Sequence, residues 1–188
     1  MHSIICGVTE SGKTTLARAL ARAFRSRGQN VIVYDPVGSA TKGGAWGEGA
    51  IRFDDPQKFW GYLSRDDVSH AHIFIDESGD LFHLGARENF WLLTRGRHFG
   101  FQVFLICQRP TMVAPTVRSQ CGIGYMFRLA RNDAREVAAD FGHDWPFKDE
   151  NGAQEPELDK GDFYLLYSGA SGKNRANIFQ LLPKESIA

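Results

Sequence analysis

The chain carries Gly7-Val-Thr-Glu-Ser-Gly12-Lys13-Thr14 close to its N-terminus, and this stretch predicts more about the fold than any other. It fits the pattern G-x-x-x-x-G-K-[S/T] at every fixed position. From average composition, such a match arises by chance in roughly 1% of chains of this length or fewer. Strand-like residues 3–7 precede it and a helical pattern follows, which is the context that the pattern requires. A glycine-rich turn that merely exposes a lysine is the alternative.

The chemistry of this stretch favours binding of nucleotide phosphates. Successive backbone N–H groups of such a loop can point at phosphate oxygens, and the helix N-terminus adds partial positive charge. We expect Lys13 to reach the β- and γ-phosphates of ATP and Thr14 to ligate Mg²⁺. The predicted binding residues are Gly7, Thr9, Glu10, Ser11, Gly12, Lys13, Thr14 and Thr15.

Outward from this loop, short apolar runs alternate with helical patterns. We expect strands at 3–7, 31–35, 72–76, 101–107 and 122–129, and helices at 14–27, 56–65, 86–99 and 132–141. The apolar runs are continuous rather than alternating, which is typical of parallel strands covered on both faces. Helices between them supply the crossover connections.

The C-terminal part carries a hairpin signal. Residues 163–167 and 176–182 flank Ser-Gly-Ala-Ser-Gly-Lys-Asn, a run of turn-forming residues. We therefore predict one α/β domain over residues 1–188. It is a doubly wound, mostly parallel sheet of the RecA-like P-loop NTPase type, with a C-terminal β-hairpin at about 162–182.

Composition agrees with a globular domain. Hydrophobic residues make up 43% of the chain, and 22 Lys and Arg balance 22 Asp and Glu. These values argue against a disordered, fibrous or uniformly basic protein. The three cysteines (6, 107 and 121) are an odd number, and two lie in apolar runs, so we expect reduced thiols and a cytoplasmic location. Neither a signal peptide nor a membrane span is predicted.

The strand expected at 72–76 runs into two acidic residues. His72-Ile-Phe-Ile-Asp76-Glu77 has the form of a Walker B strand, and a buried parallel strand delivers such side chains to its carboxyl end, where ligands of α/β proteins gather. We expect Asp76 to hold Mg²⁺ and Glu77 to act as the general base for the attacking water. Alternatively, the two acids only cap the following loop.

Three further residues are catalytic candidates. Gln108 ends the apolar run 101–107, and its amide can donate and accept at once, which suits a sensor of the γ-phosphate and the water. Arg97, and Arg95 second, could enter a neighbouring subunit's ATP site as an arginine finger. They could instead cap the carbonyls of a helix end.

The order of these motifs resembles one known family. After the phosphate loop come Val31-Ile-Val-Tyr-Asp35-Pro36, Ile73-Phe-Ile-Asp76-Glu77, Arg95-Gly-Arg97-His-Phe-Gly100 and Cys107-Gln108-Arg-Pro110. This is similar to the FtsK–HerA superfamily of ring-forming, DNA-pumping ATPases, over about residues 3–130. The resemblance implies a homo-oligomeric ring, hexameric in the family, that threads double-stranded DNA using ATP and Mg²⁺. The loop 38–49 and the hairpin match nothing in the family that we can assign.

Within this superfamily the chain looks like the genome-packaging ATPases of icosahedral double-stranded DNA viruses with an internal membrane. We expect it to lack the membrane-spanning or large accessory segments of chromosome translocases, conjugative coupling proteins and filamentous-phage assembly proteins. The resemblance implies docking on a capsid or membrane vertex protein, in the host cytoplasm or the virion.

The predicted DNA contacts are basic. Between positions 87 and 135 there are two acids and eight arginines: 87, 95, 97, 109, 118, 128, 131 and 135. Such a concentration suits phosphate contacts without sequence preference, although a solvated face is the alternative. Lys42 and Trp46 could be a pore contact, or part of an ordinary surface loop.

Other functions share the phosphate loop. A small-molecule or nucleotide kinase could use Arg128, Arg131 and Arg135 as lid arginines, and a cellular or conjugative HerA-like pump would use the same motifs. A GTPase lacks support because no Asn-Lys-x-Asp motif occurs. A non-catalytic scaffold is the third class.

Overall fold

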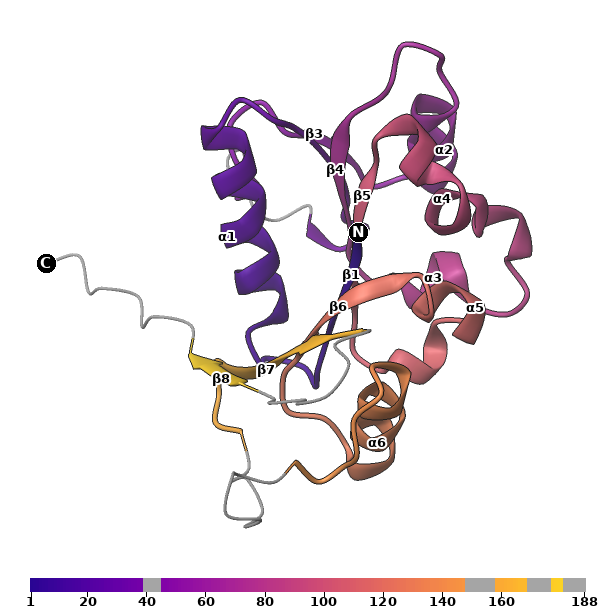
Figure 1. Ribbon diagram of the computed structural model, residues 1–188. Coiled ribbons are helices and arrows are strands. Elements are labelled where there is room, and N and C mark those ends of the chain that lie inside the picture. The colour runs from indigo at the N-terminus through magenta and orange to yellow at the C-terminus, as the bar shows by residue number, and fades with distance from the viewer. Residues whose placement is uncertain (39–44, 148–157, 169–176, 181–188) are drawn as a thin grey trace, which may run out of the picture.

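The computed structural model describes residues 1–38, 45–147, 158–168 and 177–180. One sheet runs through these residues in the strand order β3-β2-β4-β5-β1-β6-β7-β8 (Figure 1). The parallel strands are β1 (His2–Cys6), β2 (Asn30–Tyr34), β3 (Ile51–Phe53), β4 (Ala71–Ile75), β5 (Gln102–Cys107) and β6 (Cys121–Met126). The hairpin strands β7 (Asp162–Tyr167) and β8 (Asn177–Gln180) continue the sheet antiparallel. The predicted α/β class, parallel sheet and hairpin are confirmed.

The two faces of the sheet are covered unequally, as Figure 1 shows. Among the helices of the described residues, only α1 (Lys13–Ser26) lies on one face. The other face carries α2 (Pro56–Leu63), α3 (Gly79–Phe82), α4 (Trp91–Thr94), α5 (Pro115–Arg118) and α6 (Arg131–Asp140). Short 3₁₀ turns of the described residues contact these helices: η2 (Arg87–Asn89) contacts α3, η3 (Gly96–Phe99) contacts α4, and η4 (Pro110–Met112) contacts α3 and α6. None of the helices in the described residues is long and apolar enough to cross a membrane.

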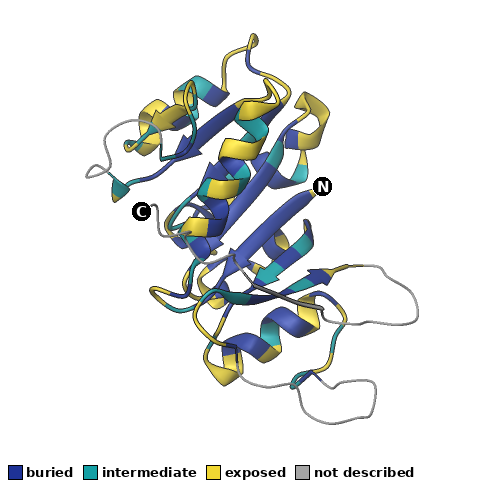
Figure 2. Cartoon of the chain, turned by 90° about the vertical axis from the view of Figure 1, so that its left-hand side faces the viewer, coloured by how far each residue is buried: buried dark blue, intermediate teal, exposed yellow. Residues whose placement is uncertain are grey.

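A hydrophobic core lies on each face of the sheet. Under α1, the buried helix residues Leu16, Ala17 and Ala21 pack towards strand residues that include Phe74 and Phe104, whose rings stack with their centroids 4.5 Å apart. The larger core on the opposite face is centred on residues such as Phe59 and Tyr164. In Figure 2 the strands are buried, whereas the helix in front of them exposes its outer side. Continuous apolar strands are explained by this double coverage.

Two predicted elements are wrong in extent. The helix expected at 86–99 is broken into η2, α4 and η3, although its apolar spacing suits a helix. Gly96 is buried, with Leu92 and Phe101 close to the position that a Cβ would take, and Gly100, with φ 74°, ends η3 just before β5. The strand expected at 122–129 ends at Met126, because Phe127 and Arg128 turn towards the phosphate loop.

The expectation of reduced cysteines is confirmed. All three thiols are free and buried in the protein interior. Burial raises the pKa of Cys107 to about 12, so this thiol stays protonated near neutral pH.

Candidate functional site

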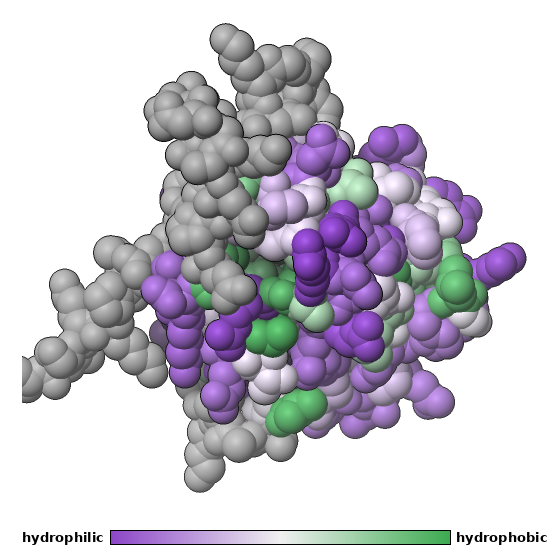
Figure 3. All heavy atoms as spheres, turned by 90° about the horizontal axis from the view of Figure 1, so that it is seen from below, coloured by the Kyte–Doolittle hydropathy of each residue, from purple (hydrophilic) through white to green (hydrophobic). Residues whose placement is uncertain are grey.

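The predicted site residues converge at the carboxyl edge of the sheet. Strand β5 lies between β1 and β4 and runs parallel to both. The last residues of these three strands, Cys6, Ile75 and Cys107, therefore lie at the same edge of the sheet. Figure 3 shows the molecule from this side, and the described surface is mainly hydrophilic, with hydrophobic residues in small groups. Parallel α/β sheets gather their ligands at this edge.

The phosphate loop is a tight turn that joins β1 to α1. Gly12 adopts φ 114° and ψ 0° directly before the first helical residue, a backbone geometry that side chains disfavour. Val8 N donates to Arg128 O at 2.8 Å, and a Cβ on Gly7 would lie 2.6 Å from Phe127 Cβ. The loop is therefore pressed against the end of β6, and only glycine fits at position 7.

Lys13 is folded over this loop. Its side chain is largely buried, and Nζ donates to Val8 O at 2.8 Å. Burial lowers the pKa of Lys13, while the charges of Asp76 and Glu77 oppose that shift. Beside it, Ser11 Oγ is buried and has no hydrogen-bond partner among the described residues. An ammonium and a free hydroxyl in a loop of backbone amides fit a phosphate group.

The two predicted metal ligands face each other. Thr14 Oγ1 donates to Asp76 Oδ2 at 3.5 Å. Burial raises the pKa of Asp76 to about 6, so a cation beside this carboxylate would relieve an unfavourable charge. Hydroxyl and carboxylate oxygens are ligands that Mg²⁺ prefers. These two residues therefore fit Mg²⁺, and they are the ones that would hold it.

Gln108 connects the phosphate loop to the end of β4. Its Nε2 donates to Glu77 Oε1 at 3.2 Å, and its Oε1 accepts from Thr9 Oγ1 at 3.2 Å. The structure thus brings together three side chains that are far apart in the sequence. Both Glu77 and Gln108 reach the surface of the site, where a water could approach them.

The backbone of the site is held in unusual conformations. Glu77 has φ 48° and Glu10 has φ 63°, in the left-handed region where a non-glycine residue costs about 1–2 kcal/mol. Such residues gather at functional sites. Ser78 fixes the Glu77 turn, because its N and Oγ both donate to Ile106 O, at 2.9 and 3.0 Å. Glu10 itself, like Thr15, is exposed.

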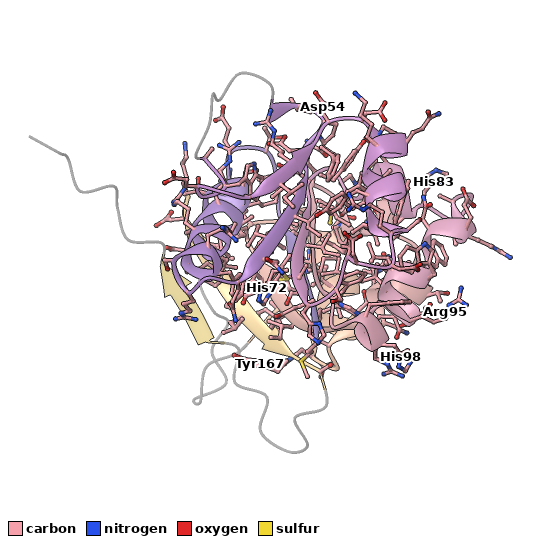
Figure 4. All side chains as sticks on the ribbon, turned by 90° about the horizontal axis from the view of Figure 1, so that it is seen from above. Asp54, His72, His83, Arg95, His98 and Tyr167 are labelled. Atoms are coloured by element: carbon pink, nitrogen blue, oxygen red, sulfur yellow. The ribbon has the colours of Figure 1, made fainter. Side chains whose placement is uncertain are left out.

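Arg95 and Arg97 lie away from this site. Both are exposed near η3, which precedes β5 and therefore lies at the amino edge of the sheet. Arg97 is close enough to His2, at the start of β1, to contribute to lowering its pKa, after the larger effects of burial and the N-terminal charge. In Figure 4, Arg95 and His98 project outward on the same side. Neither arginine lies near the phosphate loop of its own chain.

Sequence reasoning missed a buried group near Asp76, whose pKa responds to burial and also to the charges of Asp35 and Arg18. Trp46 Nε1 donates to Asp35 Oδ2 at 2.9 Å, and the Arg18 guanidinium lies 5.4 Å from the Trp46 ring centre and 3.9 Å from Asp35. Trp46 is only 3% exposed, so its assignment to a pore contact or surface loop is wrong. Lys42 lies outside the described residues.

The arginines of the basic segment 87–135 are not all exposed, contrary to what their sequence pattern indicates. Seven of its arginines are exposed: 87, 95, 97, 109, 128, 131 and 135. Arg118 is 5% exposed and pairs with Glu136 and Asp140, so counting it among the DNA contacts is wrong. The acids 133, 136 and 140 share one face of α6, and this spacing was the available signal for a buried cation.

An open groove lies beside the site. It has a volume of about 680 Å³ between α3, η4, α5 and α6, and its lining includes Asp80, Leu84, Met112 and Arg118. Leu84 and Met112 are more than half exposed, at 65% and 51%. This groove is separate from the residues that hold the phosphate loop.

Comparisons with known proteins agree with this architecture. The genome-packaging NTPase B204 from Sulfolobus turreted icosahedral virus 2, in complex with AMPPCP, superposes with a TM-score of 0.69 at 16% identity, over 95% of this chain and 96% of that one. The pCW3 conjugation coupling protein TcpA gives 0.67 at 17% identity, over 95% of this chain and 59% of that one. The type VII secretion ATPase EccC of Thermomonospora curvata gives 0.62 at 14% identity, over 98% of this chain and 24% of that one.

A family model described as the DNA-binding domain of type IV secretion-system coupling proteins matches residues 1–43. No curated protein sequence matches the chain. The resemblance found in the sequence is thereby confirmed at the level of fold: the chain has the fold of these ATPases, shared almost end to end with B204 and with one part of the longer proteins.

Proposed function

We propose that the chain is an ATP hydrolase of the FtsK–HerA superfamily that moves double-stranded DNA. The observation that carries this proposal is the bridge from Thr9 through Gln108 to Glu77. This bridge joins a hydrogen-bonding amide and a carboxylate to Thr9 of the loop that contains Lys13, which supports a role for the pair in the attack of a water on a bound γ-phosphate. A site for phosphate binding alone would not need this pair.

The proposed reaction assigns a task to each side chain. The amides of the phosphate loop and Lys13 bind the β- and γ-phosphates, and Thr14 with Asp76 would hold Mg²⁺. When bound, Mg²⁺ neutralises charge that develops on the phosphate oxygens. Glu77 takes a proton from the attacking water, which Gln108 orients. The new P–O bond forms as the bond to the β–γ bridging oxygen breaks, and ADP and phosphate leave.

Arg97, with Arg95 second, is proposed as an arginine finger that acts in a neighbouring subunit of a homo-oligomeric ring. Its position at the amino edge of the sheet supports a role outside its own site. A finger contributes about 10³–10⁵ in rate. Subunits carrying Arg97→Ala, mixed with wild-type subunits, should therefore lower activity more than in proportion to their share. Strictly proportional loss would assign Arg97 a local or structural role.

DNA is the proposed partner, without sequence preference. The seven exposed arginines support contact with phosphates, since backbone contacts carry no base information. Binding should then weaken steeply with salt, as counterions are released when phosphates are neutralised. A filter-binding measurement that shows no dependence on salt would contradict this assignment.

The finer proposal is packaging of a viral genome into a preformed capsid, with a capsid or membrane vertex protein as docking partner. The end-to-end match in fold with B204 supports it. A conjugative or cellular DNA pump is the alternative within the same superfamily, supported by the matches to TcpA and to the coupling-protein model.

One assay tests the proposed function. Phosphate release from ATP is measured with and without linear double-stranded DNA and without any acceptor molecule. We expect hydrolysis in the absence of an acceptor, stimulated by duplexes of unrelated sequence. Hydrolysis only upon addition of an acceptor would indicate a kinase, and no turnover under any condition would indicate a scaffold.

A further inference from the structure

The loop that follows Gln108, residues 109–114, is held by a buried carboxylate on α6. The side chain of Asp133 is 4% exposed. Its Oδ2 accepts from Arg109 Nε at 3.2 Å and its Oδ1 accepts from Thr111 Oγ1 at 3.3 Å. Both carboxylate oxygens thus accept hydrogen bonds from residues just after Gln108. Asp133 therefore fixes the direction in which the chain leaves β5.

A buried guanidinium holds the same loop from within. Arg118 Nη1 donates to Pro110 O at 3.0 Å and to Val113 O at 2.9 Å. Its Nε donates to Asp140 Oδ2 at 2.6 Å and its Nη2 donates to Glu136. A buried charge is tolerated only when it is paired and hydrogen-bonded, and here every nitrogen is used. Arg118 therefore ties loop 109–114 to α6.

The loop is also joined to the segment that follows Glu77. Ala114 N donates to Phe82 O of α3 at 2.8 Å, and Ser78 N donates to Ile106 O of β5 at 2.9 Å. Gln108 thus lies between two anchored segments. Before it, the end of β5 is hydrogen-bonded to Ser78, and after it, loop 109–114 is hydrogen-bonded to α6. Gln108 is exposed, so apart from its hydrogen bonds to Glu77 and Thr9 its position depends on its backbone.

We propose that Arg118, together with Asp133, is a positioning residue for Gln108. This inference rests on the proposed function, because Gln108 matters only if water attacks ATP at this site. Arg118 touches neither nucleotide nor water; it keeps Gln108 within reach of Glu77 and Thr9. A displacement of about 1 Å in such a group can cost about 10²-fold in rate.

The test uses variants that keep the fold. Arg118→Lys retains the charge but cannot reach four acceptors at once, and Asp133→Asn retains the shape but loses one acceptor. Arg25→Lys is the matched control, because Arg25 also donates to two backbone carbonyls, Glu48 O and Gln29 O, near the far end of α1. Each variant is measured for kcat, for affinity towards AMPPCP and for thermal unfolding, alone and combined with Gln108→Ala.

We expect Arg118→Lys and Asp133→Asn to lower kcat by about 10–100-fold with AMPPCP affinity little changed, and Arg25→Lys to keep the wild-type kcat. Combined with Gln108→Ala, neither should slow hydrolysis further, because both act through the side chain already removed. Wild-type rates, or losses that multiply in the combined variants, would overturn the inference while leaving the proposed function intact. A wild-type chain that hydrolyses no ATP would overturn both.

Discussion

Gln108 Nε2 lies 3.2 Å from Glu77 Oε1, although 31 positions separate the two residues in the chain. The contact exists because β5 inserts between β1 and β4, so the end of one apolar strand meets the end of another. Thr9 adds a third partner from the phosphate loop. Gln108 therefore links the phosphate loop to Glu77 through a single side chain.

Removing either member of this pair should slow the chemical step without weakening nucleotide binding. Glu77→Gln removes the base, so we expect kcat to fall by about 10²–10⁴-fold. Gln108→Ala removes the group that orients the water, and we expect a loss of about 10²-fold. Phosphate release and direct AMPPCP binding separate the two effects. Gln102→Ala, at the opposite end of β5, is the control; equal rates for the two glutamine variants would refute the role of Gln108.

Lys13→Met should abolish nucleotide binding without loss of stability. Burial lowers the pKa of Lys13, so below that pKa the folded chain holds the ammonium at a cost that the unfolded chain does not bear. Methionine removes this cost along with the phosphate contact. Thermal unfolding should show an unchanged or raised Tm without ATP, and no increase on adding ATP. The exposed Lys58→Met should behave as wild type. An ATP-dependent Tm shift that survives in Lys13→Met would contradict the assignment.

Much of the fold could be predicted from local patterns. Continuous apolar runs identified the parallel strands β1, β2, β4 and β5, and the phosphate-loop pattern identified the start of α1. The three-residue edge strand β3 and the short α3 and α5 escaped because so few residues give no periodicity. The broken helix at 86–99 shows the reverse case, in which packing around Gly96 outweighs helical spacing.

The candidate site residues could be predicted because motifs identify them, whereas the residues that support them depend on tertiary pairing. Asp76, Glu77 and Gln108 stand at the ends of apolar runs, a signal that the sequence displays directly. Arg118 looks like any surface arginine until α6 brings acids against it. Trp46 stands in a glycine-rich segment without a helix or strand pattern, and only the fold reveals its contact with Asp35.

That contact should contribute measurably to stability. Trp46→Phe keeps most of the ring packing but removes the donor to a carboxylate that is 2% exposed. A hydrogen bond to a charged group contributes about 1.5–3 kcal/mol, so we expect a loss of that order in the free energy of unfolding, measured in urea. In Asp35→Asn the same Trp46→Phe change should cost less. A loss below about 0.5 kcal/mol would show that this bond is not a significant support.

His2 should make the chain less stable in mild acid. Val103 N donates to His2 Nδ1 at 3.1 Å, and burial, followed by the N-terminal charge, lowers the pKa of His2 to about 4. Between that value and about 6.5, the unfolded chain binds a proton that the folded chain refuses. The free energy of unfolding therefore falls as pH drops through this window, by up to about 1.4 kcal/mol per pH unit from this residue.

The variant His2→Asn tests this pH dependence, since its Oδ1 can still accept from Val103 N. Urea unfolding at several values from about pH 7 to about pH 4.5 should show a shallower decline than in wild type. Burial lowers the pKa of His72 and His143 as well, so some decline remains. The exposed His98→Asn serves as control. Identical slopes for wild type and His2→Asn would contradict the assignment.

The most direct test of the central claim is displacement of a third DNA strand from a duplex that carries a short triplex. With ATP and Mg²⁺, the wild-type chain should release the third strand from duplexes of unrelated sequence, and Glu77→Gln should bind the same DNA without releasing it. A wild-type chain that hydrolyses ATP on this DNA yet never displaces the strand would contradict the claim that hydrolysis drives movement along a duplex.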